Sequence, residues 1–115
     1  MNNVDHIGIA VKSIDKSIQY YIETLGLKLM AIEEVVSQNV RVAFIDAGNI
    51  KLELLEPLSI EGPIAKFLEN RGEGVHHIEF VGTDIRTRMA ELEEKGVHLY
   101  QDAPNRGTGG AAVAM

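Results

Sequence analysis

The chain has 115 residues and a formal net charge of −6, and its length is that of a single domain with one hydrophobic core. It contains no cysteine, which excludes disulfides, thiolate metal sites and cysteine nucleophiles. Its basic residues are scattered, and because phosphate binding needs a concentrated basic face, nucleic acid is not an expected partner. The sequence shows neither a signal-peptide pattern nor a long apolar run. We therefore expect a cytoplasmic protein with no membrane partner.

Two parts of the chain repeat each other. When His6 is placed over His77, a strand followed by a helix in the first half aligns with a strand followed by a helix in the second half. The repeat is longer than a solenoid period and occurs only twice, so it predicts one pseudo-symmetric domain. We expect a first module over residues 1–58, a connecting helix over 62–72 and a second module over 75–115.

The first strand is expected over residues 4–11, where bulky apolar residues alternate with small or polar ones. Alternation sorts a strand into two faces. The bulky residues should pack on a helix, and the opposite face carries His6 among small residues such as Gly8, as expected for the lining of a cavity. The helix is predicted to start after a Ser13 cap and to end at Gly26.

The same periodicities predict three further strands and a helix after the first helix. Strands are predicted over 27–36, 40–45 and 50–55, the last two joined as a hairpin. In the third of these, alternation places Glu53 on the face opposite Leu52 and Leu54. The connecting helix is predicted from its boundary residues, with Pro63 at its first position and Gly72 after its end.

The second module is expected to begin with a strand over residues 75–81, in which Ile78 should lie in the buried core. The elements predicted to follow are a helix over 84–96, a strand over 97–100, a loop over 103–110 and a strand over 111–115. The first module continues past the equivalent point, so we expect the second module to lack its last strand within this sequence.

His6, Glu53 and His77 are the candidate metal ligands. Two neutral imidazoles and a carboxylate suit a divalent ion such as Co²⁺, Ni²⁺, Zn²⁺ or Mn²⁺. A pseudo-twofold axis would bring the two histidines of the matching strands to one centre, and the same symmetry places a fourth ligand near position 124, beyond Met115. The alternative for each histidine is a hydrogen-bonded core residue.

Glu79 is the candidate catalytic residue. It follows His77 by two positions and so shares its face, where the first module has Gly8. Beside a cation, its carboxylate could act as a base or as an extra ligand; the alternative is a solvated carboxylate at the rim. His76 is expected on the other face, either as an outer partner of the site or simply packed, and His98 is expected on the surface.

Five runs occur in the order DHIGIAV (5–11), ELLEP (53–57), PIAKFL (63–68), GEGVHHI (72–78) and GTGG (107–110). These runs resemble the methylmalonyl-CoA epimerase family of the vicinal oxygen chelate, or glyoxalase-like, superfamily. The resemblance covers nearly the whole chain.

The resemblance implies an α+β fold in which two tandem βαβββ modules form an open mixed-sheet barrel around a divalent metal, in a homodimer. His6, Glu53 and His77 match the family's first three ligand positions. The implied enzyme interconverts (R)- and (S)-methylmalonyl-CoA. In the family, the metal binds the acyl-CoA substrate through its thioester carbonyl and its carboxylate, and it stabilises the enolate that forms when the alpha proton leaves.

Two departures from the family pattern matter. The fourth ligand, a glutamate that doubles as a proposed base, has no counterpart up to Met115, and Val42 stands where some members carry the other proposed base. The two-base assignment therefore does not carry over, and Glu79 becomes the candidate. Two alternatives remain: a lactoylglutathione lyase of the glyoxalase I type, and a metal-free protein of the same fold that binds small ligands.

Overall fold

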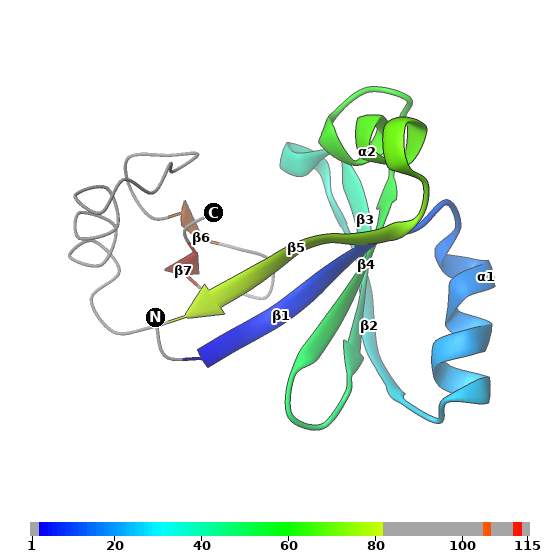
Figure 1. The fold of residues 1–115 in the computed structure, drawn as a ribbon, viewed down its shortest axis with the longest axis vertical. Helices are drawn as coiled ribbons and strands as arrows, with labels where there is room; N and C mark the ends of the chain where they lie inside the picture. The colour runs from blue at the N-terminus through cyan, green and yellow to red at the C-terminus, as the bar shows by residue number, and fades with distance from the viewer. Residues whose placement is uncertain (1–2, 82–104, 107–111, 114–115) are drawn as a thin grey trace. The chain divides into compact units, whose positions relative to one another are not determined.

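The computed structural model describes residues 3–81, 105–106 and 112–113. The chain divides into two compact units, His6–Ile78 and a second unit made of Met1–Asp5 with Glu79–Met115. The first unit holds both described α-helices and most of the sheet (Figure 1). In the part of the chain that the structure describes, no helix has the length and hydropathy to span a membrane.

The order of elements in the first half is the predicted βαβββ module followed by a helix and a strand. The elements are β1 (Asn3–Ala10), α1 (Ile14–Ile18), the π-helical turn η1 (Gln19–Thr24), β2 (Lys28–Val35), the 3-10 turn η2 (Val36–Gln38), β3 (Val40–Asp46), β4 (Lys51–Pro57), α2 (Pro63–Arg71) and β5 (Gly74–Val81). The second unit adds a two-stranded pair, β6 (Asn105–Arg106) and β7 (Ala112–Val113).

Strands β1 to β5 form one mixed, open sheet in the order β2-β3-β4-β1-β5. Strands β2, β3 and β4 form an antiparallel meander, and β1 lies parallel to β4. Helix α1 connects β1 to β2, but β2 does not pair with β1. The strand that pairs with β1 from the first half is β4, so β1 lies inside the sheet between β4 and β5. The α+β class and the open mixed sheet predicted from the sequence are confirmed.

The two helices cover opposite faces of the sheet. Alternate residues of β3 and β4 enter two separate apolar clusters, as strand alternation requires. The cluster on the α1 face contains Val11, Ile14, Ala43, Ile45 and Leu54, with Ile9 packed against it. The cluster on the α2 face contains Ala10, Val40, Val42, Phe44, Leu55 and Ile64. The predicted packing of the bulky face of β1 on the following helix is therefore confirmed.

The start of α1 is fixed by two side chains. Ser13 Oγ accepts a hydrogen bond from the Lys16 N–H at 3.3 Å, and Glu56 Oε1 accepts one from the Ile14 N–H at 2.8 Å. These acceptors satisfy N–H groups that have no partner within the helix. Gly26, with φ +74°, follows the helical segment as predicted.

Two expectations for the second half are wrong. Ile78 is 49% exposed and does not lie in the core, since β5 stands at the end of the sheet formed by the described strands, next to β1. The predicted loop over 103–110 contains β6, which pairs with β7 through Asn105↔Val113 and Arg106↔Ala112. The hydrophobic periodicity of the sequence does not reveal that two short strands pair across a glycine-rich connection. The predicted helix over 84–96, the predicted strand over 97–100 and His98 lie outside the described residues.

The packing predicts which apolar side chains stabilise the fold. Leu54 is fully buried beneath α1, so Leu54→Ala should lower the free energy of unfolding by about 2–5 kcal/mol through lost transfer energy and a residual cavity. The control is Met30→Ala on β2, where the side chain is 55% exposed and the change should stay within about 0.5 kcal/mol. Urea unfolding followed by circular dichroism measures both, and equal losses would contradict the assigned core.

Candidate metal centre

The three predicted ligands stand on three neighbouring strands. His6 lies on β1, Glu53 on β4 and His77 on β5, and β1 runs between the other two. The register pairs Gly8 of β1 with Glu53 of β4, so His6 is two residues from the position opposite Glu53. Because Leu52 and Leu54 point to the α1 face, Glu53 points to the α2 face. The sequence prediction that these residues lie opposite the α1-packed face is correct.

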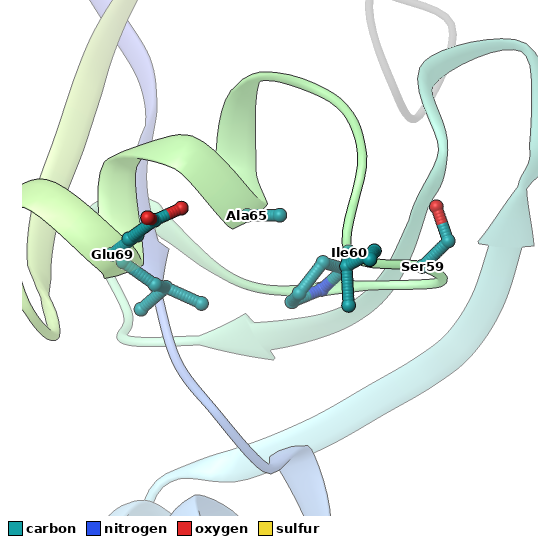
Figure 2. Close-up of a pocket in the computed structure, with 6 residues that line it drawn as sticks. Ser59, Ile60, Ala65 and Glu69 are labelled. Carbon is teal, nitrogen blue, oxygen red and sulfur yellow. The ribbon is translucent and has the colours of Figure 1, made fainter.

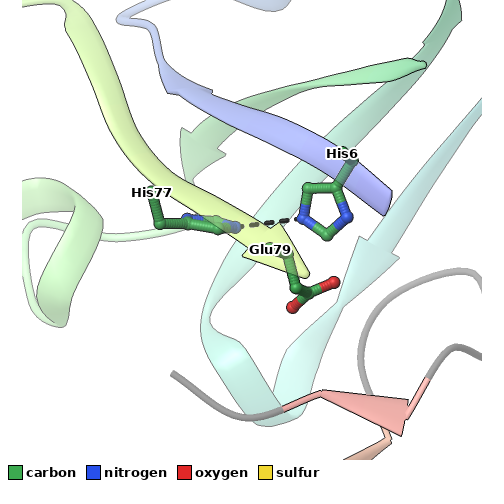
Figure 3. A group of neighbouring side chains, drawn as sticks. All are labelled: His6, His77 and Glu79. Carbon is green, nitrogen blue, oxygen red and sulfur yellow. Dashed lines mark hydrogen bonds between the residues drawn. The ribbon is translucent and has the colours of Figure 1, made fainter. Parts of the chain in front are cut away.

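His6 is the centre of the group, because its two ring nitrogens face two different partners. Its Nε2 lies 3.1 Å from His77 Nε2, and the two rings meet edge to face at an interplanar angle of 83° (Figure 3). Its Nδ1 lies 3.1 Å from Glu53 Oε2. His6 and Glu53 are each 1% exposed, so this pair is buried within the fold.

The facing Nε2 atoms have the spacing of two ligands on one ion. Nitrogens bound at about 2.0–2.1 Å with angles between octahedral and tetrahedral values are about 2.8–3.4 Å apart, and the His6–His77 distance of 3.1 Å falls in that range. Two imidazoles suit the borderline divalent ions. The donor set and its spacing therefore fit a metal of this class.

Glu53 occupies a different position relative to this pair of nitrogens. Its carboxylate contacts Nδ1 of His6, the nitrogen that faces away from His77 in the observed arrangement. A carboxylate in that position orients a metal-binding imidazole and raises its basicity. Direct ligation by Glu53 remains a prediction from the sequence, and the observed contact is also the one expected of a partner that orients His6.

The His77 imidazole lies directly over Gly8. A Cβ built on Gly8 would overlap this ring, with 2.7 Å to each of its nitrogens. The missing side chain is thus what allows the ring of β5 to approach β1. Sequence reasoning missed this role, although the signal was present: Gly8 aligns with Glu79 in the repeat, so the first module lacks a side chain where the second has one.

The His77 side chain is electrostatically suited to binding a cation. Burial, and then the neighbouring imidazoles of His6 and His76, lower the pKa of His77 to about 4. Burial also lowers the pKa of His76. At neutral pH both rings are therefore neutral, and a neutral imidazole offers one nitrogen lone pair as a ligand.

His76 contacts the site, although strand alternation predicts that it lies on the face opposite His77. Its Nδ1 lies 2.8 Å from His77 Nδ1, and its ring packs edge to face on Phe67 of α2, with centroids 5.1 Å apart. Of the two readings left open by the sequence, contact with the site and simple packing, the structure supports both.

Glu79, the candidate catalytic residue, follows His77 by two positions on β5, and strand alternation gives it the same face. Its side chain is 3% exposed, which excludes the alternative of a solvated carboxylate at the rim. Figure 3 draws it at the end of β5. Its role as a base is not tested by burial and remains a prediction.

A separate pocket lies beside α2. It has a volume of about 420 Å³ and is lined by Pro57, Ser59, Ile60, Ala65, Leu68 and Glu69 (Figure 2). None of the candidate ligands lines it, so it is not part of the metal centre.

The chain matches the model of the Glyoxalase/Bleomycin resistance protein/Dioxygenase superfamily over residues 5–115. It is 42% identical over 115 residues to the uncharacterized protein YqjC of Bacillus subtilis, covering 100% of this chain and 82% of that protein. It is 36% identical to an ethylmalonyl-CoA/methylmalonyl-CoA epimerase of Cereibacter sphaeroides, covering 98% of this chain and 86% of that protein.

The fold is also similar to a solved epimerase structure. The Streptomyces coelicolor methylmalonyl-CoA epimerase in complex with 2-nitronate-propionyl-CoA superimposes with a TM-score of 0.87 at 36% identity, covering 97% of this chain and 82% of that one. These similarities agree with the resemblance seen in the sequence.

Gly8→Ala should weaken metal binding without unfolding the protein. The added methyl group displaces the His77 ring, and the loss of ligand orientation should reduce Co²⁺ affinity by about tenfold or more. Isothermal titration calorimetry with Co²⁺ measures this. Gly74→Ala on β5 is the matched control, because a Cβ there meets no atom within 4 Å. Equal Co²⁺ affinities of the two variants would show that Gly8 does not seat the ring.

The lowered pKa of His77 predicts a pH dependence of the metal-free protein. Between its ordinary pKa of 6.5 and the folded value of about 4, the unfolded chain binds a proton at His77 and the folded chain does not. The free energy of unfolding should therefore fall as the pH decreases from 6.5 to about 4, and His77 should not change it at higher pH. Urea unfolding in EDTA from pH 7 to 4 should show a shallower decline for His77→Gln than for wild type. Identical declines would contradict the pKa assignment.

Proposed function

This chain belongs to the Glyoxalase/Bleomycin resistance protein/Dioxygenase superfamily, and from that premise we propose that it is a metal-dependent epimerase that interconverts (R)- and (S)-methylmalonyl-CoA. The observation that carries the proposal is the 3.1 Å approach of the His6 and His77 Nε2 atoms on one face of the sheet. Support for the substrate comes from the similar proteins that act on or bind acyl-CoA compounds.

In this proposal, His6 and His77 hold a divalent ion through their Nε2 atoms, and Glu53 serves as the third ligand or as the partner that orients His6. The two imidazoles suit Co²⁺, Ni²⁺, Zn²⁺ or Mn²⁺. When bound, the ion supplies positive charge that stabilises the enolate of the substrate. Burial of His6 and Glu53 keeps water from weakening these electrostatic interactions.

Glu79 is the proposed base. The carbon–hydrogen bond alpha to the thioester carbonyl breaks, its electron pair moves toward the carbonyl oxygen, and the Glu79 carboxylate takes the proton. A water molecule on the opposite face then gives a proton to the planar carbon, which inverts the centre, and Glu79 releases its proton to solvent to balance the step. The support for Glu79 is its buried carboxylate on the same strand as His77, two residues further along the chain.

A homodimeric assembly is proposed from the family resemblance alone. A cytoplasmic location is proposed as the expectation from the sequence pattern and does not rest on that resemblance. The lyase alternative shares the donor set, because an enediolate proton transfer on a glutathione adduct would use the same two imidazoles. Substrate discrimination therefore has to be measured directly.

The decisive experiment is deuterium exchange. The protein with added Co²⁺ is incubated with (2R)-methylmalonyl-CoA in D₂O, and the proposal expects incorporation of one deuterium at the alpha carbon, followed by mass spectrometry. His77→Ala should lose most of this activity and most Co²⁺ binding while remaining folded, since its side chain lies outside both apolar clusters. Val36→Ala, at a position that is 77% exposed, is the control.

Each outcome has a defined meaning. Exchange no faster than in a protein-free blank would reject the epimerase. Conversion of the methylglyoxal–glutathione adduct in its place would identify the lyase, and failure to bind Co²⁺ with no gain in melting temperature would favour the metal-free binding protein. A His77→Ala variant that unfolds with unchanged metal content would reject the site.

A further inference from the structure

Three imidazoles form a continuous chain beginning at the buried carboxylate. Glu53 Oε2 is 3.1 Å from His6 Nδ1, His6 Nε2 is 3.1 Å from His77 Nε2, and His77 Nδ1 is 2.8 Å from His76 Nδ1. Each contact joins a different ring nitrogen. Both nitrogens of His77 are therefore engaged, one toward His6 and the other toward His76.

The contact between two Nδ1 atoms constrains the position of the protons. A neutral imidazole carries one N–H and one lone pair, so at 2.8 Å one Nδ1 must donate and the other must accept. A His77 ring that offers its Nε2 lone pair to a cation carries its proton on Nδ1. In that state Nδ1 of His76 is the acceptor.

His76 is itself held in place from the other side. Its ring packs on Phe67 of α2 at an interplanar angle of 78°, and the Arg71 guanidinium lies 5.9 Å from the centre of the Phe67 ring. Helix α2 therefore contacts His76 through Phe67, and His76 contacts the nitrogen of His77 that faces away from His6. This arrangement connects the orientation of His77 to the packing of the helix.

We propose that His76 is a positioning residue, whose Nδ1 accepts the Nδ1–H of His77 and so holds His77 Nε2 toward the metal centre. Metal-binding histidines commonly donate their second N–H to a carboxylate or a carbonyl; in this chain an adjacent imidazole takes that place. The inference rests on the metal site of the proposed function and adds to it a partner that selects one tautomer of His77.

Two substitutions separate the hydrogen bond from packing. His76→Phe keeps an aromatic ring against Phe67 and removes the acceptor, whereas His76→Asn keeps an acceptor at the δ position and removes the ring. His76→Phe should weaken Zn²⁺ and Co²⁺ binding by about 10–100-fold, and His76→Asn should retain an affinity close to that of wild type. Calorimetry measures the affinities, and thermal unfolding of the metal-free variants monitors the fold.

A spectroscopic readout reports the tautomer directly. In the Zn²⁺-loaded wild type and His76→Asn, ¹H–¹⁵N spectra of the imidazoles should show a slowly exchanging His77 Nδ1–H, because that proton is hydrogen-bonded. In His76→Phe the same proton should exchange rapidly. A residue that acted through packing alone would produce the opposite ranking, with His76→Asn the more damaged variant.

The outcomes distinguish this inference from the proposed function. If wild type binds Zn²⁺ and both variants bind it equally well, or equally poorly, the positioning role is overturned while the metal site stands. If wild type binds neither Zn²⁺ nor Co²⁺, the metal site is rejected and the role of His76 is rejected with it. Loss in His76→Phe with retention in His76→Asn supports the inference.

Discussion

The 3.1 Å approach of the His6 and His77 Nε2 atoms is the contact on which the proposed chemistry depends. It requires that β1 and β5 be neighbours in the sheet and that both rings leave the same face. Two imidazole nitrogens at this distance either share one proton in a hydrogen bond or bind one cation. The fold thus brings together two candidate ligands that are 71 residues apart in sequence.

Three residues outside the His6–His77 pair surround this contact. Gly8 leaves the space into which the His77 ring fits, Glu53 contacts the outer nitrogen of His6, and His76 contacts the outer nitrogen of His77. Each ring is therefore contacted on the side opposite the nitrogen that faces the other ring. Rigid orientation of this kind lowers the cost of assembling a site, because little side-chain freedom is lost when the ion binds.

The sheet and the helices follow from local patterns. Alternation in β3 and β4 sorted Ala43, Ile45 and Leu54 to one face, and three- and four-residue spacing placed α1 above them. The prediction was wrong for Ile78, because periodicity shows which residues share a face but not whether other elements cover that face. It was wrong for residues 105–106 for a similar reason, since pairing with 112–113 is a non-local contact.

The sequence by itself determined the candidate ligands: a repeated histidine, a carboxylate on a matching face and a family resemblance identified His6, Glu53 and His77. Only the tertiary structure decided how they meet, with His77 on one nitrogen of His6 and Glu53 on the other. It alone brought His76 against His77, against the simple alternation of a strand. The physical reason is that residue spacing fixes the face on which a side chain lies, whereas the direction of a ring nitrogen depends on side-chain torsions that are set by packing from other strands and helices.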